Sequence, residues 1–308
     1  MNAPSMPPIR RWLVDAALRI DAALGPARVR RIVLPPRVDA SGKAGEFCAV
    51  QLDCGSVGLA FTLLGDTLAA LHASGIDPDG IMAADLVRGY GERGPSPRPL
   101  PGEGGDGCSQ AGACSERFTR DSARVLGLAA INALTRRLYD RAAYAPDGSI
   151  DSFGSLALTP GDRLGMIGHF TPLIGQARAL GIPLTVLELK PELVREEPGL
   201  IVTLDAARLA SCNKIISTST LLLNDTFEAV SAVWRTAQAV AIVGPSAGCP
   251  PDPLFAAGVS AVGAAWVVDA ESFLARVAAG EPWGATSRKV TLTPRHYPGL
   301  DALLQKTG

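Results

Sequence analysis

The sequence predicts an α/β protein in two parts, an α+β domain over residues 1–148 and a parallel-sheet domain over residues 149–308. The chain has 308 residues, of which 47% are hydrophobic, so it can build two cores. Its first half mixes helical patterns with strands that are joined by tight turns. Its second half alternates short apolar strands with helical patterns, which is typical of a parallel sheet covered on both faces.

The first part begins with a helical pattern, because apolar residues recur at helical spacing from Ile9 to Ile20. Gly55 and Ser56 then form the turn between two apolar strands. A leucine-rich stretch from about Asp121 predicts a long helix with a wide apolar face, and residues 145–149 predict a linker. We expect helices over 9–24, 66–74, 81–88 and 121–140, and strands over 28–34, 46–53 and 57–63.

A stretch dense in Gly, Pro and Ser over residues 89–116 predicts a mobile loop without fixed structure. Cys108 and Cys114 lie within it, and their spacing matches none of the common zinc pairs. The two thiols either capture a soft metal or are an accidental pair in an insertion, and the composition of the loop favours the second interpretation.

The second part places five apolar strands in succession, with helical patterns between them. We expect strands over 163–168, 183–190, 214–219, 238–244 and 261–269, and helices over about 172–180, 203–211, 221–235, 253–257 and 270–278. Ligands of parallel sheets bind beyond the carboxyl ends of the strands. Polar and glycine residues follow several of these strands, so the sequence predicts a binding site at that edge.

Composition excludes several classes of function. The 29 basic and 30 acidic residues nearly balance, which gives no support to nucleic-acid binding. No apolar run is long enough to span a membrane, and charged residues such as Asp15 interrupt the amino-terminal stretch, so no signal peptide is expected. The six cysteines include no Cys-x-x-Cys pair, which favours a reducing, cytoplasmic location. A Gly-x-Gly-x-x-Gly motif that opens a helix is also missing, so NAD binding is not indicated.

Five segments fall in the order seen in one known family. They are GMIGHFTPL (165–173), VLELKP (186–191), STLLLNDT (219–226), VGPSAGCPPDPLFAAGV (243–259) and VVDAESFLARVAAGE (267–281). The chain resembles the DUF364 family, named "putative heavy-metal chelation", and LGLAAINAL (126–134) resembles the closing helix of its usual amino-terminal partner, DUF4213. This resemblance implies an enolase N-terminal-like domain, a Rossmann-like domain and a site in the crevice between them. Enolase chemistry is not implied, because the catalytic barrel with its magnesium carboxylates is absent.

His169 and Glu188 are the candidate metal ligands. His169 lies between a predicted strand and a predicted helix, whose amino terminus favours a neutral ring that can coordinate a metal. Its alternative role is a hydrogen bond to a neighbouring carbonyl. Glu188 ends an apolar strand, where a carboxylate is costly unless it is paired, and its alternative is a salt bridge to Lys190 or an arginine. Imidazole with carboxylate suits nickel, cobalt or zinc. Cys249, which lies beside the turn at 244–248, is either a thiolate ligand or inert.

Asn132, Thr218, Asn224, Gly244 and Ser246 are the candidate ligand-binding residues. The turn that begins at Gly244 resembles an anion cradle in outline, although a tight turn explains it as well. Thr218 belongs to a hydroxyl-rich turn, and Asn224 either caps a helix or orients a ligand. The amide of Asn132 lies on an apolar helical face and needs a partner, at an interdomain contact or in the crevice.

Three functions remain open. The first is a metal-handling protein that binds a transition-metal ion or a small metal chelate in the crevice. The second is an enzyme that acts on a small anionic or nucleotide-like substrate, with His169 as general acid/base. The third is a scaffold whose crevice is only a domain interface, and the polar groups at several strand ends argue against it.

Overall fold

The computed structural model describes residues 8–37, 46–63, 65–91 and 118–308 of the chain. Its first part contains α1 (Ile9–Leu24), β1 (Val29–Val33), β2 (Phe47–Leu52), β3 (Val57–Phe61), α2 (Gly65–Ala73), α3 (Ala83–Gly91) and α4 (Arg120–Arg141). These bounds confirm the helices and strands expected there. Residues 89–91, which were expected to belong to the loop, complete α3 instead, and the rest of the expected loop, with Cys108 and Cys114, lies outside the described residues.

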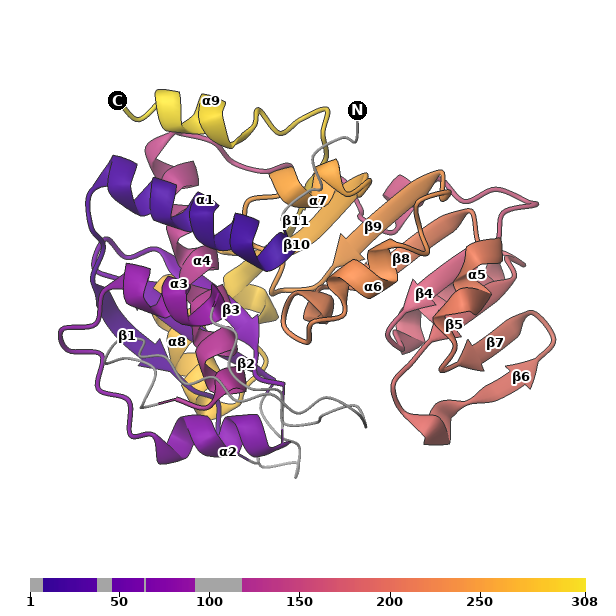
Figure 1. Ribbon diagram of the computed structural model, residues 1–308, viewed down its shortest axis with the longest axis horizontal. Coiled ribbons are helices and arrows are strands. Elements are labelled where there is room, and N and C mark those ends of the chain that lie inside the picture. The colour runs from indigo at the N-terminus through magenta and orange to yellow at the C-terminus, as the bar shows by residue number, and fades with distance from the viewer. Residues whose placement is uncertain (1–7, 38–45, 64, 92–117) are drawn as a thin grey trace, which may run out of the picture.

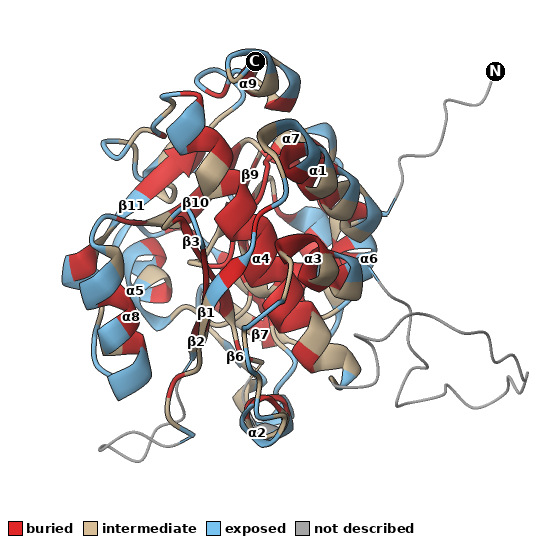
Figure 2. Cartoon of the chain, turned by 90° about the vertical axis from the view of Figure 1, so that its left-hand side faces the viewer, coloured by how far each residue is buried: buried red, intermediate tan, exposed pale blue. Residues whose placement is uncertain are grey.

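The first part is an antiparallel sheet in the order β1-β2-β3, with α1, α3 and α4 beside it (Figure 1). The helix α4 is its centre, and Figure 2 shows that most of this helix is buried. Buried apolar residues of α4 recur on nearly every side, from Val125 to Leu138. A helix that is apolar all round is stable only when other elements cover each of its faces. Helices and strands from both parts of the chain therefore surround α4.

The second part opens with η1 (Gly154–Leu156), β4 (Leu164–Ile167), α5 (Thr171–Ala179), β5 (Leu184–Leu187), η2 (Pro191–Leu193), β6 (Arg195–Glu197), β7 (Leu200–Thr203), η3 (Ala206–Ser211) and β8 (Lys214–Thr218). It continues with η4 (Ser219–Leu222), α6 (Phe227–Ser231), β9 (Ala239–Val243), α7 (Asp252–Ala256), β10 (Ala261–Val267), α8 (Ala270–Ala279), η5 (Gly284–Thr286), β11 (Ser287–Leu292) and α9 (Leu300–Gln305). The five expected strands are all present, and the parallel sheet is confirmed.

The large sheet has eight strands in the order β11-β10-β9-β8-β4-β5-β7-β6, and the six strands from β10 to β7 run parallel. From β7 to β10, these six strands are the third, second, first, fourth, fifth and sixth along the chain. The order reverses between β4 and β8, and such a reversal leaves a crevice beyond the carboxyl ends of the strands. The antiparallel strands β6 and β11 form the two edges.

Two helix predictions were wrong. The expected helix over 203–211 is the 3-10 helix η3, and the expected helix over 221–235 is split into η4 and the short α6. Asp225 causes the second break, because its φ of +59° cannot continue a right-handed helix. The expected sheet also lacked the hairpin β6–β7 and the strand β11, although Pro198 and Gly199 form a recognisable turn signal for the hairpin.

The carboxyl-terminal segments return to the first part of the chain. The helix α8 packs on β1 and β2, where Phe273, Leu274 and Val277 join Ala49 and Leu59 in one apolar cluster. The helix α1 likewise contacts α7 and α9. The main core therefore continues across residue 148, and the domain boundary at that residue stays a prediction. No helix among the described ranges is long and apolar enough to cross a membrane, and the cytoplasmic location also stays a prediction.

Gly58 allows β3 to lie directly on α4. A Cβ atom at Gly58 would lie 2.1 Å from the carbonyl oxygen of Ala129 and 2.2 Å from the amide nitrogen of Ala133. Both atoms belong to the helix backbone, so no side-chain rotation can make room. The close approach of the strand and the helix therefore depends on the missing side chain.

We predict that Gly58→Ala lowers the free energy of unfolding by about 3 kcal/mol or more, because β3 must separate from α4. Gly175→Ala in α5 is the matched control, since a Cβ there meets no atom within 4 Å. Alanine at this helical position should leave stability unchanged or raise it by about 1 kcal/mol. Urea unfolding of both variants measures the difference, and equal midpoints would contradict the proposed close approach.

Candidate functional site

The polar contact between the two parts of the chain is centred on Asn132 of α4. Its amide Nδ2 donates to the carbonyl oxygen of Leu59 in β3 at 2.8 Å and to that of Ser246, after β9, at 2.9 Å. The hydroxyl Oγ of Ser246 in turn accepts a 2.9 Å hydrogen bond from the backbone N–H of Phe61. Asn132 and Ser246 are both almost fully buried. We call these three hydrogen bonds the Asn132–Ser246 joint.

The joint fixes the turn that follows β9. Within this turn, the N–H of Gly244 donates to the carbonyl oxygen of Gly263 at 3.0 Å, which ties the turn to β10. Gly244 has a φ of +150°, and a Cβ atom there would lie 2.1 Å from the hydroxyl oxygen of Ser219. Both the backbone conformation and the space available therefore require glycine at this position.

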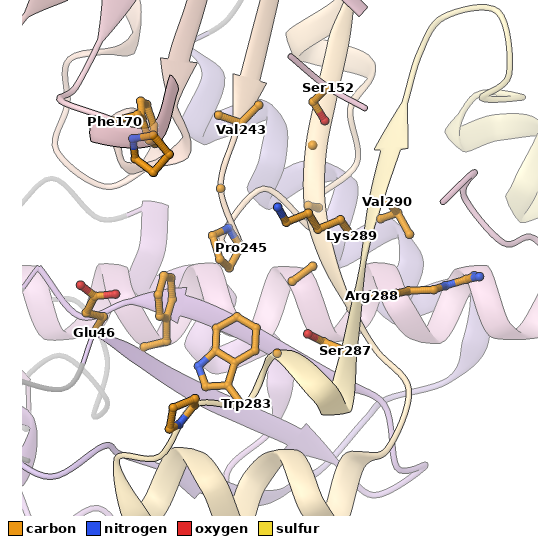
Figure 3. A pocket seen from close by; sticks show the side chains of 18 of the residues that line it. Glu46, Ser152, Phe170, Val243, Pro245, Trp283, Ser287, Arg288, Lys289 and Val290 are labelled. Carbon is orange, nitrogen blue, oxygen red and sulfur yellow. The ribbon is translucent and has the colours of Figure 1, made fainter. Parts of the chain in front are cut away.

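The turn forms one wall of a cleft with a volume of about 1250 Å³. Figure 3 shows Val243 and Pro245 on this wall, with Phe170 beyond the end of β4 and Trp283 across the cleft. Trp283 packs edge-on against Phe47 of β2 with 5.7 Å between the ring centroids. The cleft is thus bordered by strand ends of the large sheet, by the first part of the chain and by the segment after α8. Its volume is large enough for a small organic ligand.

Charged side chains of both signs border the cleft. Lys289 of β11 is exposed, and Figure 3 shows it and Glu46 at the cleft; neither makes an ion pair among the described residues. Arg288 also lines the cleft, and its guanidinium lies 5.7 Å from the ring centroid of Trp266. The other two acids are engaged, because Asp151 accepts from the N–H of Gly154 at 2.8 Å and Glu281 lies 3.6 Å from Arg276. Within the described residues, Lys289, Arg288 and Glu46 are therefore the charged side chains of the cleft with neither an ion pair nor a hydrogen bond.

The structure places His169 directly before Phe170, which lines the cleft. Gly168, with a φ of +87°, turns the chain at the end of β4, so the chain leaves the sheet at His169. The His169 side chain is half-buried, and its Nε2 atom is covered yet makes no hydrogen bond with the described residues. A buried ring nitrogen without a partner can accept a metal ion or a ligand proton. His169 itself does not belong to the cleft lining.

Glu188 lies at the neighbouring strand end. The strands β4 and β5 pair in parallel with Ile167 opposite Leu187, so His169 and Glu188 follow adjacent residues of the sheet. The carboxylate of Glu188 has neither an ion pair nor a hydrogen bond among the described residues, and the expected bridge to Lys190 is not formed. Within these residues, no group of three or more His, Cys, Asp or Glu side chains could hold a metal ion. His169 and Glu188 alone would leave a metal in need of further donors.

The remaining candidates have local partners. The hydroxyl of Thr218 accepts from the N–H of Thr220 at 3.2 Å and caps η4, and Asn224 accepts from the hydroxyl of Thr226 at 2.6 Å. Cys249 is fully buried, and burial raises the pKa of its thiol to about 12, so it is a neutral thiol at physiological pH. Thr218 and Asn224 do not line the cleft. Of the five predicted ligand-binding residues, Gly244 is the one that does.

Sequence reasoning missed the side chains that give the cleft its chemistry. Lys289 belongs to β11, which was not predicted, Trp283 lies shortly before that strand, and Phe47 was treated only as part of a strand. An aromatic residue in the Pro-Trp-Gly turn at 282–284 was a usable signal, because such turns lie at the surface. Lys289 offered no comparable signal, since a lysine on an edge strand is ordinarily solvated.

Fold and cleft together define an α/β protein with a ligand-sized cleft beside the carboxyl edge of a mainly parallel sheet. Residues 151–294 match the family DUF364, whose description reads "Putative heavy-metal chelation". No curated protein matches the chain. The resemblance of the first part to DUF4213 stays a prediction.

Two solved structures of DUF364 proteins share the fold. One, a protein with unknown function from Pyrococcus horikoshii, is 15% identical and superposes with a TM-score of 0.60, covering 91% of this chain and 99% of that chain. The other, from Desulfitobacterium hafniense DCB-2 and also of unknown function, is 17% identical with a TM-score of 0.60, covering 92% and 98%. At these identities the likeness shows a common fold, which extends over both parts of the chain.

We predict that Gly244→Ala lowers the free energy of unfolding by about 1–3 kcal/mol, because alanine at this φ is strained and its Cβ meets Ser219. Ser219→Ala in the same chain removes the hydroxyl but leaves the backbone strain. The double variant should therefore recover part of the loss in a thermal unfolding experiment. A Gly244→Ala variant with the wild-type melting temperature would contradict this description of the turn.

Proposed function

We propose that the protein binds a transition-metal complex of a small anionic organic chelator in the cleft. The observation that carries the proposal is the cleft itself, with aromatic rings on its walls and, at its border, charges of both signs that have no ion pair within the described part of the chain. Phe170, Trp283 and Phe47 would contact the organic part of the chelate, and Lys289 would attract its carboxylates. Glu46 would face its positive groups.

The residues near the cleft fit a metal that arrives with some of its own donors. Among the described residues, the covered Nε2 atom of His169 and the carboxylate of Glu188 have no partner, which gives two protein donors at adjacent strand ends. A tetrahedral or octahedral ion needs four to six donors, and an organic chelator supplies the rest. Imidazole and carboxylate together favour nickel, cobalt or zinc, and the metal would be cargo.

We further infer that the second part is Rossmann-like and that the first part resembles the enolase N-terminal fold. The strand order of the six parallel strands supports the first inference, since doubly wound sheets have this order and bind ligands where it reverses. The antiparallel order β1-β2-β3, with α4 of the same part packed on β2 and β3, supports the second. Both agree with a site between the two parts.

The proposal predicts that a nickel complex binds more tightly than bare nickel. Isothermal titration with Ni²⁺, with nitrilotriacetate and with their one-to-one complex should show the complex binding at least tenfold more tightly than either component. His169→Ala should lower the affinity for the complex tenfold or more, which is about 1.4 kcal/mol. The fold should stay intact, because the substitution removes a half-buried group and no core volume. Lys289→Met should also lower the affinity for the complex tenfold, by removing charge attraction.

Lys306→Met is the matched control, because Lys306 is an exposed lysine just after α9 and does not line the cleft. It should bind the complex as the wild type does. Equal binding of the nickel complex by all four proteins would contradict the proposal. Binding of nitrilotriacetate with no metal dependence would also contradict it, and would favour the alternative of an enzyme for a small anionic substrate with His169 as acid/base.

A further inference from the structure

A second cavity, with a volume of about 890 Å³, lies where the amino termini of α1 and α4 meet the loop before α6. No residue of this cavity lines the cleft described above. The lining of the second cavity includes Arg10 from the first turn of α1, Arg120 from the first turn of α4 and Asp225 from the loop, and Arg124 lies behind this lining, one turn further along α4. We call Arg10, Arg120 and Arg124 the arginine cluster.

The arginine cluster converges on one carboxylate. Asp225 forms ion pairs with Arg10 through Oδ1 and with Arg124 through Oδ2, and its Oδ2 also lies 3.2 Å from Arg120. The three arginine side chains are 14%, 24% and 5% exposed, whereas that of Asp225 is 46% exposed. The cations are thus more deeply buried than the anion that serves all three.

Other acids nearby only partly balance these charges. Asp121 approaches Arg124 at 3.5 Å but is 45% exposed, and Glu228 accepts a 3.0 Å hydrogen bond from the backbone N–H of Ile9. Burial and the charges of Arg10 and then Arg120 lower the pKa of Arg124, while Asp225 raises it. Two neighbouring guanidinium groups therefore oppose the charge on Arg124, and the carboxylate of Asp225 favours it.

The donors of the cluster are also incompletely used. The Nε atoms of Arg10, Arg120 and Arg124 are all covered, and none has a hydrogen-bond acceptor among the described residues. A guanidinium carries five N–H donors in a planar fork that matches the oxygens of a phosphate. Two helix amino termini add partial positive charge at the same place, since α1 and α4 have 16 and 22 residues.

Asp225 itself occupies the position of an anionic ligand. Its φ of +59° is unusual for a residue other than glycine, although Asp tolerates it better than most. In this conformation of the loop, the carboxylate of Asp225 contacts three arginines. The wall beside it is apolar and includes Val14, Leu222 and Phe227.

We propose that the arginine cluster binds the phosphate group of a small soluble phosphomonoester, with the organic part of the ligand along this apolar wall. The phosphate brings more oxygen acceptors and more charge than Asp225 supplies alone. The guanidinium groups turn toward the phosphate oxygens, which gives their Nε–H donors acceptors, and half-exposed Asp225 is released to solvent.

Phenyl phosphate, inorganic phosphate and phenol are the probes for this site. By isothermal titration, phenyl phosphate should bind at least tenfold more tightly than inorganic phosphate, and phenol should not bind. Arg120→Gln should lower the affinity for phenyl phosphate tenfold or more. Arg295→Gln, at an exposed arginine outside this cavity, should bind phenyl phosphate as the wild type does. Equal affinity of the Arg120→Gln and Arg295→Gln variants would overturn the proposal.

Asp225→Asn separates a binding site from a purely structural ion-pair cluster. Without ligand this variant should melt at a lower temperature, because three guanidinium groups lose their shared carboxylate. Phenyl phosphate should raise its melting temperature more than that of the wild type, by preferential binding to the folded state. A rise no larger than that in sodium chloride of equal ionic strength would show a structural cluster and overturn the proposal.

Vesicles with phosphatidate distinguish a lipid headgroup from a soluble ligand. The protein should not sediment with them beyond its background with neutral vesicles. Sedimentation with phosphatidate together with no binding of phenyl phosphate would overturn the soluble-ligand proposal. Because this cavity is separate from the cleft, nickel–nitrilotriacetate binding should be the same in the Asp225→Asn variant, so the two proposals can fail independently.

Discussion

The arrangement of the two parts of the chain depends on the two hydrogen bonds that the side-chain amide of Asn132 donates. This amide joins a carbonyl of β3 to a carbonyl of the turn after β9 from inside a helix that is buried on nearly every side. If this buried amide lost either acceptor, one of its N–H groups would have no hydrogen bond to offset its removal from water, which costs about 1–3 kcal/mol. Gly58 makes the bond to β3 possible, because only a bare backbone lets the strand come this close to α4.

The cleft follows from this contact. Once the turn after β9 is held against β3, Pro245 stands on one wall, while α8 returns across β1 and β2 and carries the chain to Trp283. The cleft is therefore built from segments far apart in the sequence, and its shape depends on both parts of the chain. Such a site differs from a loop pocket, because its walls cannot move apart without breaking buried hydrogen bonds and apolar contacts.

The sequence predicted most of the fold and less of the site. Helical spacing and apolar strands located α1, α4 and the five central strands, because burial imposes a strong periodicity on such elements. Short edge strands such as β6 and β11 carry charged residues and lack that periodicity. The break at Asp225 was missed because its ion pairs join it to Arg10 and Arg124, which are far away in the sequence and leave no local signal.

Single residues show the same limit at the site. Gly244 was placed correctly at a strand end that borders the cleft, since glycine after a strand is a local signal. Asn132 was recognised as an amide in need of a partner, and one alternative, an interdomain contact, describes its hydrogen bonds. The hydroxyl oxygen of Ser246, a predicted ligand-binding residue, accepts a hydrogen bond from the backbone N–H of Phe61, which is 185 residues away in the sequence. Long-range pairing of this kind has no local pattern.

The central claim is that the cleft, formed around the Asn132–Ser246 joint, holds a metal with its organic chelator. A crystal structure of the protein with nickel–nitrilotriacetate, measured at the nickel absorption edge, tests it most directly. We expect one strong anomalous peak at the border of the cleft near His169, with density for the chelator between Trp283 and Lys289. A nickel peak elsewhere on the protein, or a peak at His169 with no chelator density in the cleft, would contradict the claim.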